Sequence, residues 1–137
     1  MLILSALLVG ITEEYIFRGL LFPLLSKGSV KNGILLSTFI FSMWHILNIN
    51  TSSVPVLIGQ LLFTLGFGAF LAVVYLTKKN IIIPMLLHGT YNSLSFVVTI
   101  PGKTETNNNI PIIPIFLGLI FSIFAIYTYI RNKNKKY

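Results

Sequence analysis

The chain has 137 residues, of which 55% are hydrophobic and only 9% are charged. A soluble domain carries roughly 25% charged residues, so this composition excludes an ordinary soluble protein and predicts an integral membrane protein. The net charge of +7 comes mainly from lysines and arginines that lie between or after apolar runs, which is typical of charges beside a membrane and argues against binding of nucleic acid.

Five apolar segments follow one another along the chain, and a bilayer is crossed by ~20 residues of α-helix. Stretches of turn-forming composition separate them, at SKGSVKNG, NINTSS, TKKN and PGKTETNNN. The sequence therefore predicts an all-α fold, a polytopic membrane helix bundle with about five transmembrane helices in a single domain over residues 1–137. The expected helices cover residues 2–25, 30–47, 54–76, 81–100 and 110–130.

The distribution of positive charge predicts the orientation of this bundle. If all five segments span the membrane, eight of the ten lysines and arginines fall on one side, in the first loop, the third loop and the C-terminal tail. Lys103 lies on the other side, and Arg18 lies inside the first segment. Because lysine and arginine accumulate on the cytoplasmic side, we expect a cytoplasmic C-terminus and an N-terminus outside.

The third segment, residues 54–76, contains Gly59, Gly66 and Gly68 but no acidic, basic or histidine residue. Small residues let membrane helices approach one another closely. We therefore expect this segment to serve helix packing alone.

Ionisable residues are concentrated elsewhere, in or near apolar segments. Such a residue within a membrane helix costs at least ~2.5–3.5 kcal/mol, so it usually faces a protein interior or water. Glu14 and Arg18 are four residues apart and can form an ion pair on one helical face. Glu13 then lacks a partner on its own helix, and a carboxylate removed from water can act as a general base. By itself, this pattern fits a buried ion-pair network and a catalytic site equally well.

The two histidines also allow two interpretations each. His45 lies near the end of the second segment, where a structural histidine is the commoner case, and Phe41 is expected to pack beside its ring. His88 and Asn92 are four residues apart and fit an interhelical hydrogen-bonding pair. Taken together, however, a carboxylate, two imidazoles and an amide from three segments are sufficient to hydrolyse a peptide bond.

The chemistry of metals gives an alternative. Two histidines and a glutamate can bind zinc, and Glu13, His45 and His88 are the only ligand candidates. The motifs H-E-x-x-H and G-x-S-x-G are absent, and the chain has no cysteine. The residues leave open a glutamate-dependent mechanism that requires no cofactor and one that requires a divalent metal such as zinc.

Three short motifs stand in order along the chain: EEYIFR, FSMWH and HGTYN. This ordered set resembles that of the CPBP intramembrane protease family, also called the Abi or CAAX protease-like family. Pro84, four residues before His88, also fits that family's pattern. The resemblance implies a membrane-embedded endopeptidase with a water-filled cavity among its helices. It also implies that Glu13 and His45 activate water, that His88 and Asn92 bind the oxyanion, and that Glu14 and Arg18 are supporting residues.

The resemblance carries further expectations. Members of that family have more membrane helices before the first motif, whereas twelve residues precede Glu13 here, so we expect a minimal member or a chain that lacks upstream helices. The expected partners are membrane lipid and a membrane-associated peptide or protein substrate. The Ile-, Asn- and Lys-rich composition favours a bacterial cell membrane, where prenylated CAAX substrates are not expected.

Two other functions remain open at this point. The first is a non-catalytic membrane protein that retains the fold, such as a bacteriocin self-immunity or regulatory partner. The second is a transporter fragment that uses Glu13 as a proton site, which accounts less well for the spacing of His88 and Asn92.

Overall fold

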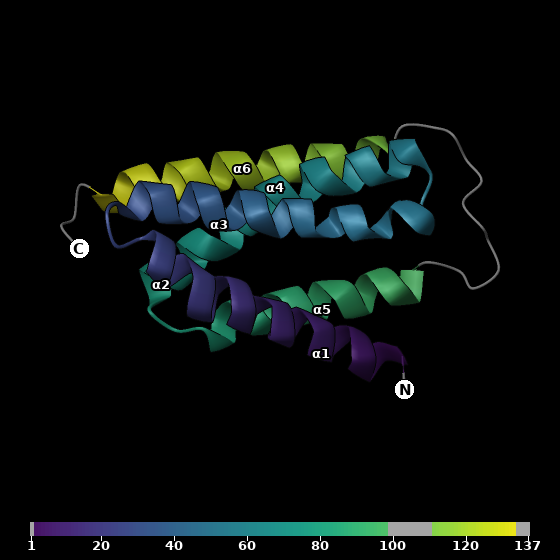
Figure 1. Ribbon diagram of the computed structural model, residues 1–137, viewed down its shortest axis with the longest axis horizontal. Coiled ribbons are helices and arrows are strands. Elements are labelled where there is room, and N and C mark those ends of the chain that lie inside the picture. Colours follow the sequence, from purple (N-terminus) through teal and green to yellow (C-terminus); the bar gives the residue numbers. More distant parts are fainter. Residues whose placement is uncertain (1, 99–110, 134–137) are drawn as a thin grey trace.

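A computed structural model describes residues 2–98 and 111–133, and every regular element within these ranges is a helix (Figure 1). The predicted all-α membrane bundle is therefore confirmed. The ends of two expected helices, at residues 99–100 and 110, lie outside the described residues. The elements in chain order are α1 (Leu2–Glu14), η1 (Tyr15–Leu21), α2 (Phe22–Leu25), α3 (Val30–Trp44), η2 (His45–Asn50), α4 (Val54–Lys78), α5 (Ile82–Val98) and α6 (Ile112–Lys133).

The first expected helix is not regular along its whole length. After Glu14 it passes into η1, a π-helical stretch, and it returns to α-helical geometry in α2. Pro23, near the start of α2, has no backbone N–H to donate to the preceding turn, which interrupts the α-helical hydrogen bonds there. π-helical turns are rare and often occur at functional sites. This one contains Arg18 and follows directly after the two adjacent glutamates.

The second expected helix also changes its geometry at its motif. α3 ends at Trp44, and the chain continues as the 3₁₀ helix η2, which begins at His45. A 3₁₀ turn is tighter than an α-helical one and turns its side chains in different directions. His45 therefore lies at a junction between two helix types, not inside a regular helix.

The helices pack in two groups. α4 packs along α6 and against α3, while α1 packs along α5. In Figure 1 the α1–α5 pair lies beside the other three long helices, and η1 and α2 contact α3. Glycine pairs mark the closest contacts: Gly66 lies against Gly118 between α4 and α6, and a Cβ at Gly10 of α1 would lie only 2.6 Å from the backbone nitrogen of Gly89 in α5. These helices touch backbone to backbone.

Three helices in the described part of the chain are long and apolar enough to cross a membrane: Val30–Asn50, Val54–Lys78 and Ile112–Lys133. Their surfaces expose large apolar side chains, among them Phe39, Leu62 and Phe124, which lipid would cover. The first expected span carries three charged residues, and α5 is described over 17 residues. The chain is an integral membrane protein, while five crossings and a cytoplasmic C-terminus stay predictions.

Candidate active site

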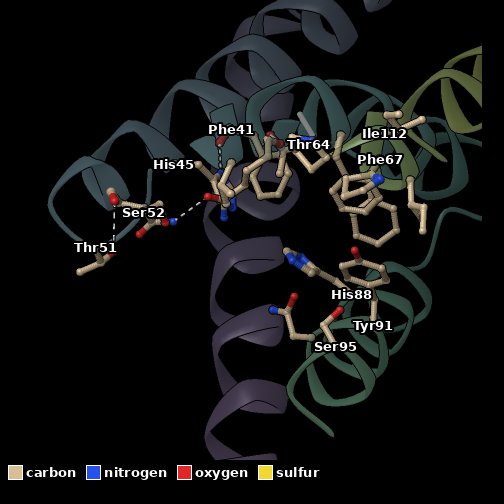
Figure 2. Close-up of a pocket in the computed structure, with 18 residues that line it drawn as sticks. Phe41, His45, Thr51, Ser52, Thr64, Phe67, His88, Tyr91, Ser95 and Ile112 are labelled. Carbon is tan, nitrogen blue, oxygen red and sulfur yellow. Dashed lines mark hydrogen bonds between the residues drawn. The ribbon is translucent and has the colours of Figure 1, made fainter. Parts of the chain in front are cut away.

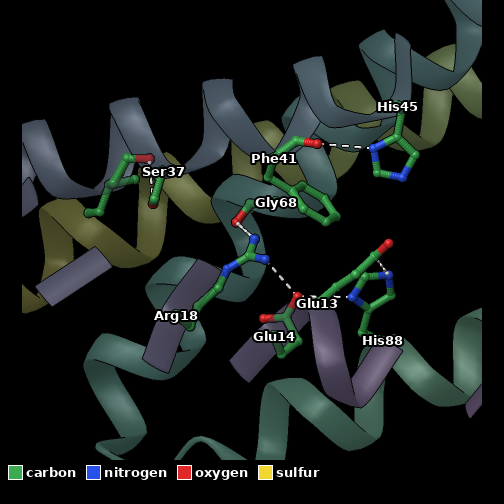
Figure 3. A network of polar contacts seen from close by, with 9 residues as sticks. Glu13, Glu14, Arg18, Ser37, Phe41, His45, Gly68 and His88 are labelled. Carbon is green, nitrogen blue, oxygen red and sulfur yellow. Dashed lines mark hydrogen bonds and ion pairs between the residues drawn. The ribbon is translucent and has the colours of Figure 1, made fainter. Parts of the chain in front are cut away.

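A buried ion pair connects α1 to η1 (Figure 3). Arg18 Nη1 donates to Glu14 Oε1 over 2.6 Å, and both side chains are fully buried. This confirms the ion pair that the four-residue spacing predicts. Loss of either partner would leave the other charge buried without compensation, so substitution of one of them alone is expected to destabilise the fold.

Arg18 also contacts both neighbouring helices. Its Nη2 donates to the carbonyl oxygen of Gly68 in α4 over 2.8 Å, and its guanidinium carbon lies 4.6 Å from the centroid of the Phe41 ring. A Cβ at Gly68 would lie 2.8 Å from that ring and 3.3 Å from Arg18 Nη2, so glycine leaves room for this contact. The prediction that residues 54–76 serve packing alone is therefore wrong, because α4 supplies a backbone acceptor that its side-chain pattern does not reveal.

His88 of α5 contacts both adjacent glutamates of α1. Its Nδ1 lies 2.9 Å from Glu14 Oε1, and its Nε2 lies 3.5 Å from Glu13 Oε2 (Figure 3). The imidazole is almost fully buried. Glu13 thus has no partner on its own helix, as the spacing indicates, but finds one on α5. The two glutamates differ in their surroundings: the Glu14 side chain is fully buried, whereas 17% of the Glu13 side chain is exposed.

Phe41 places its ring between the two histidines. The ring makes edge contacts with His45 at 5.1 Å and with His88 at 5.6 Å between centroids, and its side chain is fully buried. The expected packing of Phe41 beside His45 is confirmed. The same ring lies under the Arg18 guanidinium, so one aromatic side chain sets the positions of three functional groups.

Hydrogen bonds determine which nitrogen of each neutral histidine carries the proton. His45 Nδ1 lies 3.0 Å from the carbonyl oxygen of Phe41, which can only accept, so Nδ1–H donates and Nε2 keeps a lone pair. His88 Nδ1 likewise faces a Glu14 carboxylate oxygen and donates to it, which leaves Nε2 toward Glu13. His45 can therefore accept a proton from water at Nε2. His88 can donate at Nε2 only when its ring is doubly protonated.

A cavity of about 1380 Å³ lies between the two groups of helices (Figure 2). The structure brings three predicted site residues to its wall, namely His45, His88 and Asn92. In Figure 2 His88 and Tyr91 lie on the α5 side, and His45 and Phe41 lie across from them. Hydrolysis by these residues needs a space of this kind, where water and a peptide can reach both walls.

The cavity wall also contains polar residues that the sequence analysis did not single out. Gln60 and Thr64 of α4 line it, together with Tyr91 of α5. Gln60 accepts a hydrogen bond from Asn48 Nδ2 over 3.1 Å. Gln60 and Thr64 are four residues apart in an otherwise apolar segment, and this spacing on one helical face could have revealed them.

Glu13 lies beside this cavity and is not part of its lining. It lines a smaller, mostly apolar cavity of about 350 Å³ with Thr12 and Trp44, and it reaches the larger one through its contact with His88. The expectation that all four residues meet in one cavity therefore holds for three of them. Glu13 approaches the same histidine from the side of α1.

The zinc alternative needs three ligands at one point. Within residues 2–98 and 111–133, no group of three histidine, cysteine, aspartate or glutamate side chains is close enough to hold a metal ion. Glu13 and His88 are neighbours, but His45 does not lie close enough to both of them to complete a set of three ligands. The three candidates therefore do not fit a zinc site as they are arranged here.

Comparison with known proteins agrees with the motifs. The family model described as type II CAAX prenyl endopeptidase Rce1-like matches residues 1–94, which include all three motifs and end two residues after Asn92. This match confirms the predicted resemblance to CAAX proteases. No curated protein and no solved structure gives a significant match to the chain.

Proposed function

This chain belongs to the Rce1-like family of type II CAAX prenyl endopeptidases, and on that premise we propose that it hydrolyses peptide bonds within the membrane. The proposed substrates are membrane-associated proteins or peptides, and the proposed setting is a bacterial cell membrane. At the level of the family, the chain is a protease-type membrane protein.

The contact of His88 with both glutamates at the wall of the large cavity carries this proposal. A helix bundle that catalyses no reaction does not require two carboxylates and an imidazole beside a cavity. Each of these groups has a free-energy cost within a membrane, so together they favour a functional role. Carboxylates and an imidazole in contact with one another at a cavity wall are candidates for an active site.

In the proposed reaction, Glu13 is the general base. It takes a proton from a water molecule, which the lone pair on His45 Nε2 helps to orient, and the water oxygen forms a bond to the peptide carbonyl carbon. The carbonyl oxygen becomes an oxyanion, which accepts hydrogen bonds from the Asn92 amide and from protonated His88 Nε2. When the C–N bond breaks, the proton held by Glu13 passes to the leaving amine, so protons and charges balance over the step.

The proposed reaction requires a second proton on the His88 ring, and the two neighbouring carboxylates can accept hydrogen bonds from that form of the ring. Glu13 and Glu14 contribute two negative charges when ionised, and Arg18 contributes one positive charge. One further proton on His88 would bring the sum of these four charges to zero. In this state Glu13 is free to accept a proton and His88 is able to donate one, as the reaction requires.

The test is a proteolysis assay in detergent or liposomes against the host's membrane and secreted peptides, with the wild type and Glu13→Ala side by side. We expect cleavage by the wild type and a loss of ~10²–10⁴-fold in the variant, which is the usual contribution of a general base. An exposed substitution on another helix, Ile58→Ala, serves as the control. Absence of cleavage by the folded wild type would favour the non-catalytic alternative, an immunity or regulatory partner.

A further inference from the structure

The two ends of the bundle differ in charge. One end, on the left in Figure 1, holds the turn between α2 and α3 and the C-terminal ends of α4 and α6. The opposite end holds η2 and the starts of α1, α4 and α6, and residues 45–56 and 111–115 there include no lysine, arginine, aspartate or glutamate. Among residues 2–98 and 111–133, the exposed cationic residues gather at the first end: Lys27, Lys31, Lys78, Lys79, Arg131 and Lys133.

The large cavity opens at the end that holds η2. Its innermost lining residues, Phe41 and His88, are at most 3% exposed. Two of its lining residues lie at that end of the bundle: Thr51, in the turn before α4, and Ile112, the first residue of α6. Thr51 is exposed, and Ile112 is 75% exposed. The exposed fraction of the lining residues therefore increases from the ionic network toward the end that holds η2.

The opposite route, from the cationic end to the network, is filled by packed side chains. A buried cluster of α2, α3, α4 and α6 lies there, and it includes Phe22, Ile34, Val73 and Ala125. The ring of Tyr75 packs edge-on against Phe22. Substrate cannot pass a close-packed core of this kind without unfolding it.

The rim of the cavity has two chemically different sides. On one side, η2 and the turn that follows it present the neutral polar residues Asn48, Thr51 and Ser52. On the other side, the start of α6 presents Pro111–Pro114, which are apolar. Apart from the histidines, none of the described residues that line this cavity is charged, so the rim fits an uncharged chain that passes from lipid on one side to water on the other.

We propose, on the basis of the function proposed above, that the site receives its substrate from the non-cytoplasmic side of the membrane, as an uncharged segment of a membrane-inserted peptide. Lysine and arginine accumulate on the cytoplasmic side, so the cationic end faces the cytoplasm and the mouth of the cavity faces outward. The substrate class is then an exported peptide anchored in the outer leaflet. A peptide that remains in the cytoplasm cannot reach the site.

The absence of cysteine makes the direction of access directly measurable. Single-cysteine variants are labelled with a membrane-impermeant maleimide in intact cells and after permeabilisation. Thr51→Cys reports the rim, Val56→Cys the cavity wall and Lys27→Cys the cationic end. Ile58→Cys is the matched control, because Ile58 lies on the same helix as Val56 and is exposed, but does not line the cavity.

We expect Thr51→Cys and Val56→Cys to react with the maleimide in intact cells. Lys27→Cys should react only after permeabilisation. Ile58→Cys should react several-fold more slowly than Val56→Cys, because lipid excludes water from its position. The reverse pattern, with Lys27→Cys labelled in intact cells, would overturn the proposed direction. Val56→Cys that stays unlabelled in every condition would show that no open cavity exists. Neither result depends on cleavage, so both are separate from failure of the proteolytic function.

The chemistry of the substrate is tested by protection of Val56→Cys in the Glu13→Gln background, where the peptide is not consumed. The probe is a synthetic peptide with an apolar anchor of ~20 residues joined to an uncharged segment. We expect it to slow labelling several-fold when added from outside, and the same peptide with lysines in that segment to have no effect. Equal protection by the two peptides, or protection by neither, would contradict an uncharged membrane-inserted substrate.

Discussion

The buried network around Glu14 and the cavity wall around His45 are built from the same kinds of residue, but they differ in how they use their polar groups. Glu14 Oε1 accepts from both Arg18 and His88, and Arg18 also donates to a backbone carbonyl. His45 uses only Nδ1 in a hydrogen bond, to the carbonyl oxygen of Phe41, and its ring lines an open cavity. Paired groups in a closed site determine stability, whereas groups beside water are available for chemistry.

Glu13 and Glu14 show the same contrast between a closed and a more open environment in two adjacent residues. Glu14 is fully buried and lies in the network, while Glu13 is partly exposed and has one longer contact with His88. A step of one residue on a helix turns the side chain by about 100°, which directs the two carboxylates to different surroundings. We therefore expect substitutions in the two regions to separate folding from activity.

The largest effect is expected for Arg18→Ala. The substitution leaves Glu14 buried without its cation and removes the contact with Gly68, so the free energy of unfolding should fall by ~3–5 kcal/mol. Size-exclusion chromatography and thermal unfolding in detergent measure the loss of folded protein. Arg131→Ala, which removes an exposed arginine at the end of α6, is the control. Equal yields of the two variants would refute the structural role of the network.

Glu13→Gln should have the second largest effect, and on activity alone. The amide keeps the shape of the side chain but cannot accept the proton from water, so the cleavage rate should fall by ~10²–10⁴-fold while the unfolding temperature stays near that of the wild type. Glu14→Gln provides the contrast, because it should lower both. If the two amides destabilise the protein equally, the proposed division between the glutamates is wrong.

Phe41→Leu should have a smaller effect on both regions together. The ring contacts His45, His88 and the Arg18 guanidinium, and aromatic contacts of this kind contribute ~0.5–1.5 kcal/mol beyond the buried area. We expect lower thermal stability together with lower cleavage rate. Phe39→Leu on the same helix is the matched control, because Phe39 is exposed at the helix surface and should leave both measurements unchanged.

The smallest effect is expected for Gln60→Leu at the cavity wall. The substitution removes the hydrogen bond from Asn48, but Asn48 remains beside water, so the cost should be near the lower end of ~0.5–1.5 kcal/mol. A double-mutant cycle with Asn48→Leu measures the coupling between the two side chains. A coupling energy well above that range would show that this pair contributes to stability as strongly as the network around Glu14 does. That result would contradict the comparison.

The sequence predicts contacts within one helix better than contacts between helices. The Glu14–Arg18 ion pair follows from a spacing of four residues, and Phe41 beside His45 follows from the same spacing. The contact of His88 with Glu14 joins positions 74 residues apart, and no local pattern specifies which face of α5 meets α1. The chain's motifs indicate that these residues belong together, but the distances come only from the packing.

Two further features could not be derived from side-chain types. Gly68 acts through its carbonyl oxygen, and every residue has one, so only the position of the Arg18 guanidinium reveals its role. The π-helical turn of η1 likewise has no distinctive composition apart from the proline that follows it. The expected regular helix over residues 2–25 is accordingly replaced by three helical elements.

The backbone contact between Gly10 and Gly89 has a mechanical consequence. It holds α1 close against α5, so Glu13, Glu14, His88 and Asn92 are carried by one pair of helices, whereas His45 is carried by the other group. If the two groups move apart to admit a peptide, the spacing between Glu13 and His88 is preserved and the gap to His45 widens. The step that closes the bundle over a peptide would then also bring His45 up to the reacting water, which couples capture of the substrate to assembly of the catalytic site.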